Sequence, residues 1–233
     1  AHEWFMFHAA EYGFKMANAL SLEHWVDVYR GDLGVALSDT YTTEVFFQQF
    51  DKKFAKLFDG VRHDSGDPIE FANKTIAHYV KNGIDPLFKY IIFSDGLNLE
   101  KVEEITHACK GRIGISFGIG TNLTNDVGVQ PMNIVMKLIG VQANNGDWIP
   151  TVKLSDEHGK YTGDPKMIEL AKAVKELVDG QAKFPDWNKR DDIKSALKVD
   201  LILLLDEFGY PPVERDEVYV EIFEQAENFK KNQ

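Results

Sequence analysis

The sequence predicts an α/β fold built on a parallel β-sheet whose strands are joined by right-handed helical crossovers. Two observations predict this fold. Short apolar runs recur along the first half of the chain and alternate with segments in which apolar residues have helical spacing. A polar cluster also follows each apolar run, and polar clusters at the carboxyl ends of parallel strands are where ligands bind in barrels and open sheets.

Four stretches have the character of short strands with a polar end. They are GVALSDT (34–40), GVRHD (60–64), YIIFSDG (90–96) and IGISFGIG (113–120). Between successive strands lie amphipathic helical stripes at 45–58, 69–80 and 99–106. Because all four polar ends precede the next helix, we expect them to converge at one edge of the sheet.

The remainder of the chain is less regular. MNIVMKLIGV (132–141) and WIPTVKLS (148–155), separated by the turn ANNGD, predict an antiparallel strand pair. Residues 165–179 predict a helix with Pro165 in its first turn.

The pattern suggests three parts, with a soft boundary near residue 180. Residues 1–130 hold the βα units, and 131–180 hold the strand pair and a helix. Residues 181–233 form a charged helical appendage for packing or oligomer contacts, broken at Pro211-Pro212 and frayed at its lysine-rich end.

Composition excludes several classes of function. Hydrophobic residues make up 44% and charged residues 27%, as in a soluble globular protein. The net charge of −11 argues against a general nucleic-acid binder, although single arginines, backbone N–H groups and a divalent cation could still hold a small phosphorylated ligand. No apolar run has membrane-spanning length, so we expect no membrane partner.

The compartment is predicted from the only cysteine and the first residues. Cys109 cannot form an internal disulfide, and no secretory signal is visible, so we expect a cytoplasmic protein. The chain begins at Ala1 without methionine, and we therefore expect it to be a piece of a longer polypeptide.

Three carboxylates, Asp39, Asp64 and Asp95, follow three successive strands, and Asp95 comes directly after Ser94. Any one of them could simply cap a helix. However, strand alternation places Arg62 on the same side as Asp64 and turns His63 to the other side. Such a guanidinium could grip an oxyanion while the carboxylate binds sugar hydroxyls or hydrated Mg²⁺; a structural ion pair is the alternative.

The turn FGIGTN, with Gly118, Gly120 and Thr121, could cradle a phosphate with its backbone N–H groups, and the start of a helix could aid this binding. The signal is weak, because Leu123 occupies the last glycine position of the dinucleotide-binding pattern.

His2 has two interpretations: an exposed or helix-capping residue, or a nucleophile that accepts a phosphoryl group. Asp39 is a better candidate to orient its ring than the adjacent Glu3. The other histidines have no comparable setting and are interpreted as surface or packing residues: His8, His24, His63, His78, His107 and His158.

Taken together, AHEW, ALSDT, GVRHDSGDP, FSDGLN and FGIGTNLTND, in this order and at these separations, resemble the second half of bacterial nicotinate phosphoribosyltransferases. The resemblance runs from residue 1 to about 180 and includes KLSDEHGK (153–160). The ordered set is highly specific. The sister nicotinamide enzymes usually read RPDSGNP and GSGGG where this chain has RHDSGDP and GIGTN, which favours the nicotinate branch.

The resemblance implies an irregular (β/α) barrel of the type II phosphoribosyltransferase kind, here only its later strands, plus strands of a mixed α/β domain. It implies an ATP-coupled, phosphoribosyltransferase/ligase-type enzyme of NAD salvage. This enzyme joins nicotinate to 5-phosphoribosyl 1-diphosphate through a phosphohistidine, works with Mg²⁺, and acts as a homodimer. The N-terminal half of the family, which supplies much of the nicotinate pocket, is absent from this sequence.

The resemblance also implies roles for single residues. His2 matches the phosphorylated histidine, and Asp39 matches an acid beside it. Arg62 and Asp64 match the pair that faces the diphosphate and ribose. The residues that match contacts to the sugar and its 5′-phosphate are Ser94, Asp95, Gly118, Gly120 and Thr121. The identity of any metal ligands stays open.

Two alternatives are kept. One is a nicotinamide or quinolinate phosphoribosyltransferase, which a competition assay among the three pyridines would distinguish. The other is a non-catalytic chain that completes a site on a partner polypeptide.

Overall fold

The computed structural model describes residues 1–32, 34–132, 134–142, 146–157, 159–181 and 190–209. The chain forms two units, residues 1–162 and 163–233, which are described separately. The expectations for His158, for the Pro211-Pro212 break and for the lysine-rich end lie outside the described residues. The domain boundaries expected near 130 and 180 stay a prediction.

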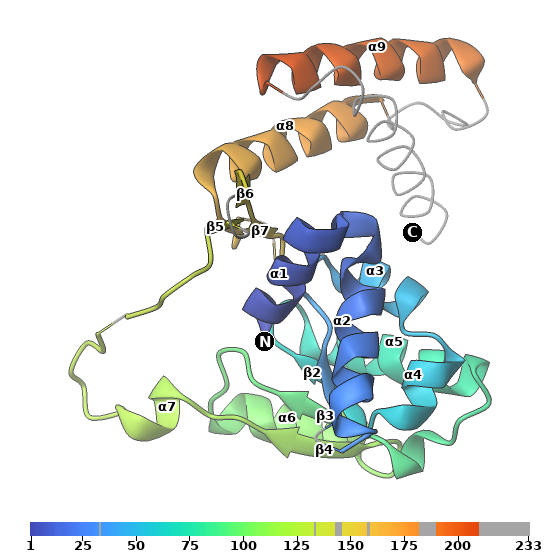
Figure 1. Cartoon of the computed structure of the whole chain (residues 1–233). Helices are drawn as coiled ribbons and strands as arrows, with labels where there is room; N and C mark the ends of the chain where they lie inside the picture. The colour runs from blue at the N-terminus through green and yellow to red at the C-terminus, as the bar shows by residue number, and fades with distance from the viewer. Residues whose placement is uncertain (33, 133, 143–145, 158, 182–189, 210–233) are drawn as a thin grey trace. The chain divides into compact units, whose positions relative to one another are not determined.

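The centre of the first unit is the predicted parallel sheet (Figure 1). Its strands lie side by side in chain order, and they are β1 (Val35–Leu37), β2 (Gly60–His63), β3 (Tyr90–Phe93) and β4 (Gly114–Phe117). All three neighbouring pairs are parallel. The carboxyl ends of the strands therefore meet at one edge of the sheet, as the sequence predicts.

Helices connect these strands. They are α3 (Thr43–Gln49) and α4 (Lys52–Leu57) after β1, α5 (Pro68–Lys81) and the 3₁₀ helix η1 (Pro86–Phe88) after β2, and α6 (Leu99–Cys109) after β3. The stripe expected as one helix over 45–58 is split into α3 and α4, because Asp51 starts a new helix by accepting hydrogen bonds from the backbone N–H groups of Lys53 and Phe54.

Two further helices precede the sheet, and the sequence analysis did not foresee them. They are α1 (His2–Tyr12) and α2 (Phe14–Tyr29), which pack against each other (Figure 1). Gly13 separates them with a φ of 81°, a conformation that favours glycine. Helix α1 brings His2, its first residue, toward the ends of β1 and β2.

The predicted antiparallel pair is shorter than expected. After β4 and the short helix α7 (Thr121–Thr124), β5 (Gly140–Gln142) pairs with β6 (Trp148–Pro150), whereas β7 (Val152–Lys153) pairs with β8 (Thr162–Gly163). The chain leaves the first pair after Thr151, whose N–H still donates to Ile139.

Residues 153–156 (KLSD), here called the KLSD segment, leave the strand pair and bind to residues that follow β1 and β2. The N–H of Leu154 donates to the Thr40 carbonyl (2.9 Å), and the N–H of Asp156 is 3.1 Å from the Ser65 hydroxyl oxygen. The Asp156 carboxylate accepts the N–H of Thr43, the first residue of α3, at 2.7 Å, and also its hydroxyl. The KLSD segment therefore links the chain after β6 to the ends of β1 and β2.

A largely aromatic core fills the first unit. Phe46 and Phe50 of the first crossover stack at 4.9 Å between ring centroids, and both are almost fully buried. The buried strand residues Val61, Ile91 and Phe93 belong to the same core. This burial fixes the crossover helices on the sheet and therefore the loops that follow each strand.

In the second unit, α8 (Pro165–Gln181) and α9 (Asp191–Glu207) pack through an apolar seam. Its centre is Ile193, Leu197 and Leu201, with Val174 and Leu177 against them. The helix predicted over 165–179 is confirmed. Among the described residues, no helix is both long and apolar enough to cross a membrane.

Close approach of two strands predicts that Gly60→Ala destabilises the sheet. A methyl group on Gly60 would lie 2.0 Å from the carbonyl oxygen of Tyr90 in β3, and backbone atoms cannot move aside as a flexible side chain can. We expect a loss of about 3 kcal/mol of unfolding free energy, measured by urea denaturation. Gly180→Ala, where the added methyl group meets no other described residue within 4 Å, is the control, and equal effects of the two changes would contradict the prediction.

Asp156, which binds the KLSD segment to Thr43, should make the stability of the fold depend on pH. Burial raises the pKa of Asp156 from its ordinary value of 3.8 to about 6, although the hydrogen bonds from Thr43 oppose the rise. A raised carboxyl pKa stabilises the fold at pH values below 3.8, and this stabilisation is lost as the pH rises through about 6.

We therefore expect Asp156→Asn, which keeps hydrogen-bonding partners for Thr43, to gain stability relative to the native chain as the pH rises through this interval. The gain should approach about 3 kcal/mol, since one pKa unit corresponds to about 1.4 kcal/mol. Urea denaturation at a series of pH values measures it. The exposed neighbour change Glu157→Gln should show no such trend, and a pH-independent difference for Asp156→Asn would disprove the assignment.

Candidate active site

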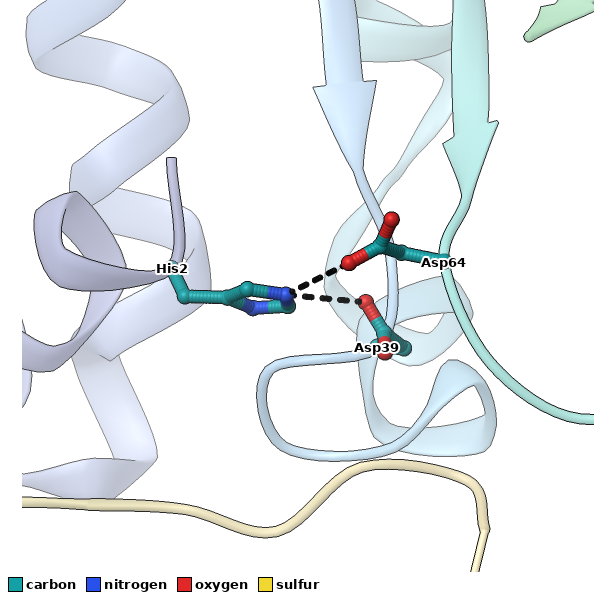
Figure 2. A group of neighbouring side chains, drawn as sticks. All are labelled: His2, Asp39 and Asp64. Carbon is teal, nitrogen blue, oxygen red and sulfur yellow. Dashed lines mark hydrogen bonds and ion pairs between the residues drawn. The ribbon is translucent and has the colours of Figure 1, made fainter. Parts of the chain in front are cut away.

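His2 is buried and is held by three side chains from the sheet edge. Its Nδ1 is 2.9 Å from the Thr40 hydroxyl oxygen, and its Nε2 is 3.1 Å from Asp64 Oδ2. Nε2 also lies 3.8 Å from Asp39 Oδ1. Figure 2 shows the ring edge pointing between the two carboxylates, which follow β1 and β2. Of the two interpretations of His2, the exposed one is therefore wrong.

The hydrogen-bond partners determine the tautomer of neutral His2. A carboxylate can only accept, so Nε2 carries the proton and donates to Asp64, and Nδ1 accepts from the Thr40 hydroxyl. The sequence analysis favoured Asp39 over Glu3 to orient the ring. Asp64 in fact makes the closest contact, while Glu3 lies 3.7 Å from the terminal amino group.

Asp39 is only 1% exposed, and its two oxygens have different surroundings. Oδ2 accepts the Ser65 hydroxyl at 2.6 Å and lies 3.4 Å from the ammonium group of Lys153. Oδ1, which faces His2, has no hydrogen-bond partner within the described parts of the chain. A buried carboxylate oxygen without a donor is costly, and it suits a positively charged neighbour.

Arg62, Asp64 and Ser94 form a closed group on the neighbouring strands. Arg62 donates from Nη2 to Asp64 Oδ1 and from Nε to Ser94 Oγ, each at 2.8 Å, and Ser94 Oγ lies 2.8 Å from Asp64 Oδ1. Burial opposes ionisation of Asp64. The hydrogen bonds from His2 and Ser94, together with the Arg62 guanidinium, outweigh burial and hold the pKa of this carboxyl well below its usual range.

The strand alternation expected around His63 is confirmed. Arg62 and Asp64 meet on one side of the sheet, whereas His63 is buried on the other, between Phe71 and Phe93. Burial lowers the pKa of His63, so its ring is held neutral as a packing residue.

Helix capping does not explain the three acids. Helices α5 and α6 are capped by the side chains of Asp67 and Asn98, and the first N–H of α3 is bound by Asp156. Asp39, Asp64 and Asp95 lie ahead of these caps. Their carboxylates are therefore left for other partners.

Asp95 and the glycine turn border this network without joining it. Asp95 is 3.8 Å from Lys160. A methyl group on Gly118 would lie 3.4 Å from Ser94 Cβ, so the turn begins beside the network. Gly120 and Thr121 are exposed at the start of α7, and no hydrogen bond or ion pair joins them to the acids in the described structure.

The His2, Asp39 and Asp64 side chains could hold a metal ion. Each offers one ligand atom, and the three atoms lie within 4.8 Å of one another. The unpartnered Asp39 Oδ1 fits a cation at this position, because the carboxylate oxygens of Asp39 and Asp64 suit Mg²⁺ or Mn²⁺. The space between the three groups therefore holds either the imidazole proton or a metal cation.

Sequence reasoning missed three residues of this network: Thr40, Ser65 and Lys153. Thr40 and Ser65 lie directly after the assigned acids, in SDT and DSG, so their positions were a usable signal. Lys153 lies in KLSDEHGK, far along the chain, and nothing in its local sequence indicates a contact with Asp39.

Comparison with known proteins gives two family matches. Residues 1–178 match the model of the nicotinate phosphoribosyltransferase (NAPRTase) family. Residues 151–232 match a model described as type I restriction enzyme HindI endonuclease subunit-like, C-terminal, which the sequence analysis did not foresee. The second match covers the whole of α8 and α9 and overlaps the end of the first.

Relatives support the first match. The chain is 67% identical over 174 residues to a nicotinate phosphoribosyltransferase of Chromohalobacter salexigens, covering 75% of this chain and 45% of the relative. It is 52% identical over 181 residues to one of Desulforapulum autotrophicum, covering 77% and 46%. The crystal structure of the Porphyromonas gingivalis nicotinate phosphoribosyltransferase is 55% identical, with a TM-score of 0.70, covering 74% of this chain and 45% of that one.

The chain thus spans about half the length of the curated relatives it matches. The segment that they share contains β1 to β4, the acids after these strands, and His2. Since the family model covers well over half of the sequence, the chain belongs to the nicotinate phosphoribosyltransferase family.

Proposed function

We propose that this chain supplies the phosphoryl-accepting and diphosphate-facing part of a nicotinate phosphoribosyltransferase. The reaction joins nicotinate to 5-phosphoribosyl 1-diphosphate and is coupled to ATP, giving nicotinate mononucleotide, diphosphate, ADP and phosphate. One observation carries the proposal: the buried His2 imidazole contacts Asp64, which is bound in turn by Arg62 at the carboxyl ends of parallel strands.

Arg62 would face the leaving diphosphate. Departure of diphosphate from the ribose C1 builds negative charge on the leaving group and positive charge on the sugar. The side chain of Arg62 is 40% exposed, so its guanidinium can reach a ligand while it remains bound to Asp64 and Ser94. Asp64 would bind ribose hydroxyls as the positive charge develops.

His2 would accept the γ-phosphoryl group of ATP. In the tautomer described above, the lone pair lies on Nδ1, and Asp64 holds the proton on Nε2. A phosphoryl group adds about two negative charges beside two carboxylates. The nearby cations Arg62 and Lys153 offset part of this repulsion.

Mg²⁺ would bind at Asp39 and Asp64 when the Nε2 proton of His2 does not occupy the space between them, and the unpartnered Oδ1 of Asp39 supports this placement. When bound, the ion supplies positive charge that stabilises phosphoryl and diphosphate oxygens. The sugar-phosphate would lie across the next two strand ends. Its proposed contacts are Ser94, Asp95, Gly118, Gly120 and Thr121.

The alternatives are separable from this function. The motifs RHDSGDP and GIGTN favour nicotinate over nicotinamide as substrate. A competition assay that includes quinolinate would distinguish the third pyridine. Because the chain spans about half of its relatives, the nicotinate pocket would require residues of the other half. The homodimer and the cytoplasmic location stay predictions.

A chimera tests the function directly. Residues 1–178 of this chain would replace the matching segment of the Chromohalobacter salexigens relative, and formation of nicotinate mononucleotide would be measured with and without ATP. Activity of the chimera with nicotinate supports the proposal. An inactive, folded chimera beside an active parent would show that this site is not competent.

In this chimera, His2→Asn should abolish the acid-labile, base-stable label from γ-labelled ATP and leave some uncoupled transfer, because the acceptor nitrogen is lost while Arg62 remains. Labelling is measured on the denatured protein. His107→Asn, at an exposed histidine of α6, is the control and should label normally. Undiminished labelling of His2→Asn would remove His2 from this role.

Arg62→Lys in the chimera should raise the KM for 5-phosphoribosyl 1-diphosphate by about tenfold or more and change the KM for nicotinate little. Lysine cannot reproduce the forked contact of a guanidinium with Asp64, Ser94 and an oxyanion. Steady-state kinetics measure both constants. The exposed Arg112→Lys is the control, and equal losses for both substrates would indicate a purely structural arginine.

A further inference from the structure

Lys153 is a buried lysine in an acidic site, and the proposed function gives it only a share in offsetting the phosphoryl charge. It is the last residue of β7 and is 8% exposed. Its ammonium group lies 3.4 Å from Asp39 Oδ2. A buried lysine is unfavourable unless an anion compensates it, so the position of Lys153 depends on Asp39.

The contact distinguishes the two oxygens of Asp39. Lys153 and the Ser65 hydroxyl both occupy Oδ2, and this leaves Oδ1 to face His2 without a hydrogen-bond partner among the described residues. The Lys153 charge therefore lies on the side of the carboxylate opposite to the candidate cation position. It fixes the orientation of Asp39 and also repels any cation bound to Oδ1.

The other positive groups nearby do not have this position. Arg62 binds Asp64 Oδ1, whereas His2 approaches Asp64 Oδ2. Lys160 is exposed and lies 3.8 Å from Asp95. Within the described chain, Lys153 is thus the ammonium group paired with Asp39 itself.

We propose that Lys153 is a built-in counter-ion that positions Asp39 and keeps divalent-cation binding at His2, Asp39 and Asp64 weak. The two carboxylates are each paired with one cationic side chain, so the site has little net negative charge with which to retain a metal ion. The consequence for Mg²⁺ rests on the proposed function: the ion is held firmly only when a phosphorylated substrate or phosphohistidine adds negative charge.

The test measures Mn²⁺ binding to the 233-residue chain by electron paramagnetic resonance, at a slightly alkaline pH where free imidazole is neutral. Mn²⁺ is the probe because it accepts both carboxylate and imidazole ligands. We expect Lys153→Met to bind Mn²⁺ about tenfold more tightly, or better, than the native chain, since one repelling charge is removed while Ser65 still orients Asp39.

Three matched variants make the result specific. Lys153→Arg keeps the charge and should retain native affinity. Lys53→Met removes a lysine that pairs with Glu23 on the surface, and it should also behave as the native chain. Adding Asp39→Asn to Lys153→Met should cancel the gain, which places the tighter binding at Asp39.

Unchanged or weaker binding by Lys153→Met would overturn the proposal, as would equal gains in the Arg and Met variants or no Mn²⁺ binding in any variant. Circular dichroism checks folding. If Lys153→Met does not fold, Lys153→Gln replaces it, because glutamine can still donate to Asp39 without the charge, and the same tightening is expected. Neither ATP nor nicotinate is present, so the outcome is independent of the labelling and transfer tests.

Discussion

The contact of the His2 imidazole with two carboxylates is the constraint on which the rest of the site depends. His2 lies at the start of α1, 62 residues before Asp64 in the chain, and it is buried where β1 and β2 end. Two anions around one imidazole edge require a hydrogen-bond donor or a cation between them, either the N–H of Nε2 or a metal ion. The adjoining loops hold the two carboxylates and the ring around this position.

Asp39 and Asp64 are bound in the same way, each by one cationic side chain and one hydroxyl group. Asp64 has a guanidinium from Arg62 and a hydroxyl from Ser94, while Asp39 has an ammonium group from Lys153 and a hydroxyl from Ser65. In each pair the cation and the hydroxyl bind the same oxygen, and the other oxygen faces His2. This arrangement pairs each carboxylate with a cation and orients it in a largely buried site, where an unpaired charge would be strongly unfavourable.

Sequence reasoning recovered the parts of the site that depend on local pattern. Strand alternation placed Arg62 beside Asp64, and the rule that ligands bind at the carboxyl ends of parallel strands assigned Asp39 and Ser94 to the same edge. It could not find Lys153, because this contact with Asp39 depends on how the chain returns after β6. Nor did it find α1 and α2. Their aromatic and other apolar residues lie on several sides of each helix, so the sequence shows no clear apolar face.

The charged groups of the site are paired within the first unit, whereas some apolar side chains of this unit are exposed. Among the described residues, every cation and hydroxyl that holds Asp39 and Asp64 comes from residues 1–162. By contrast, apolar side chains at 127–139 are strongly exposed, Met132 and Met136 most of all. The chain spans about half of its relatives' length, and an exposed apolar surface of this kind is typical of a contact surface. The electrostatics around His2 can therefore be studied in this chain alone.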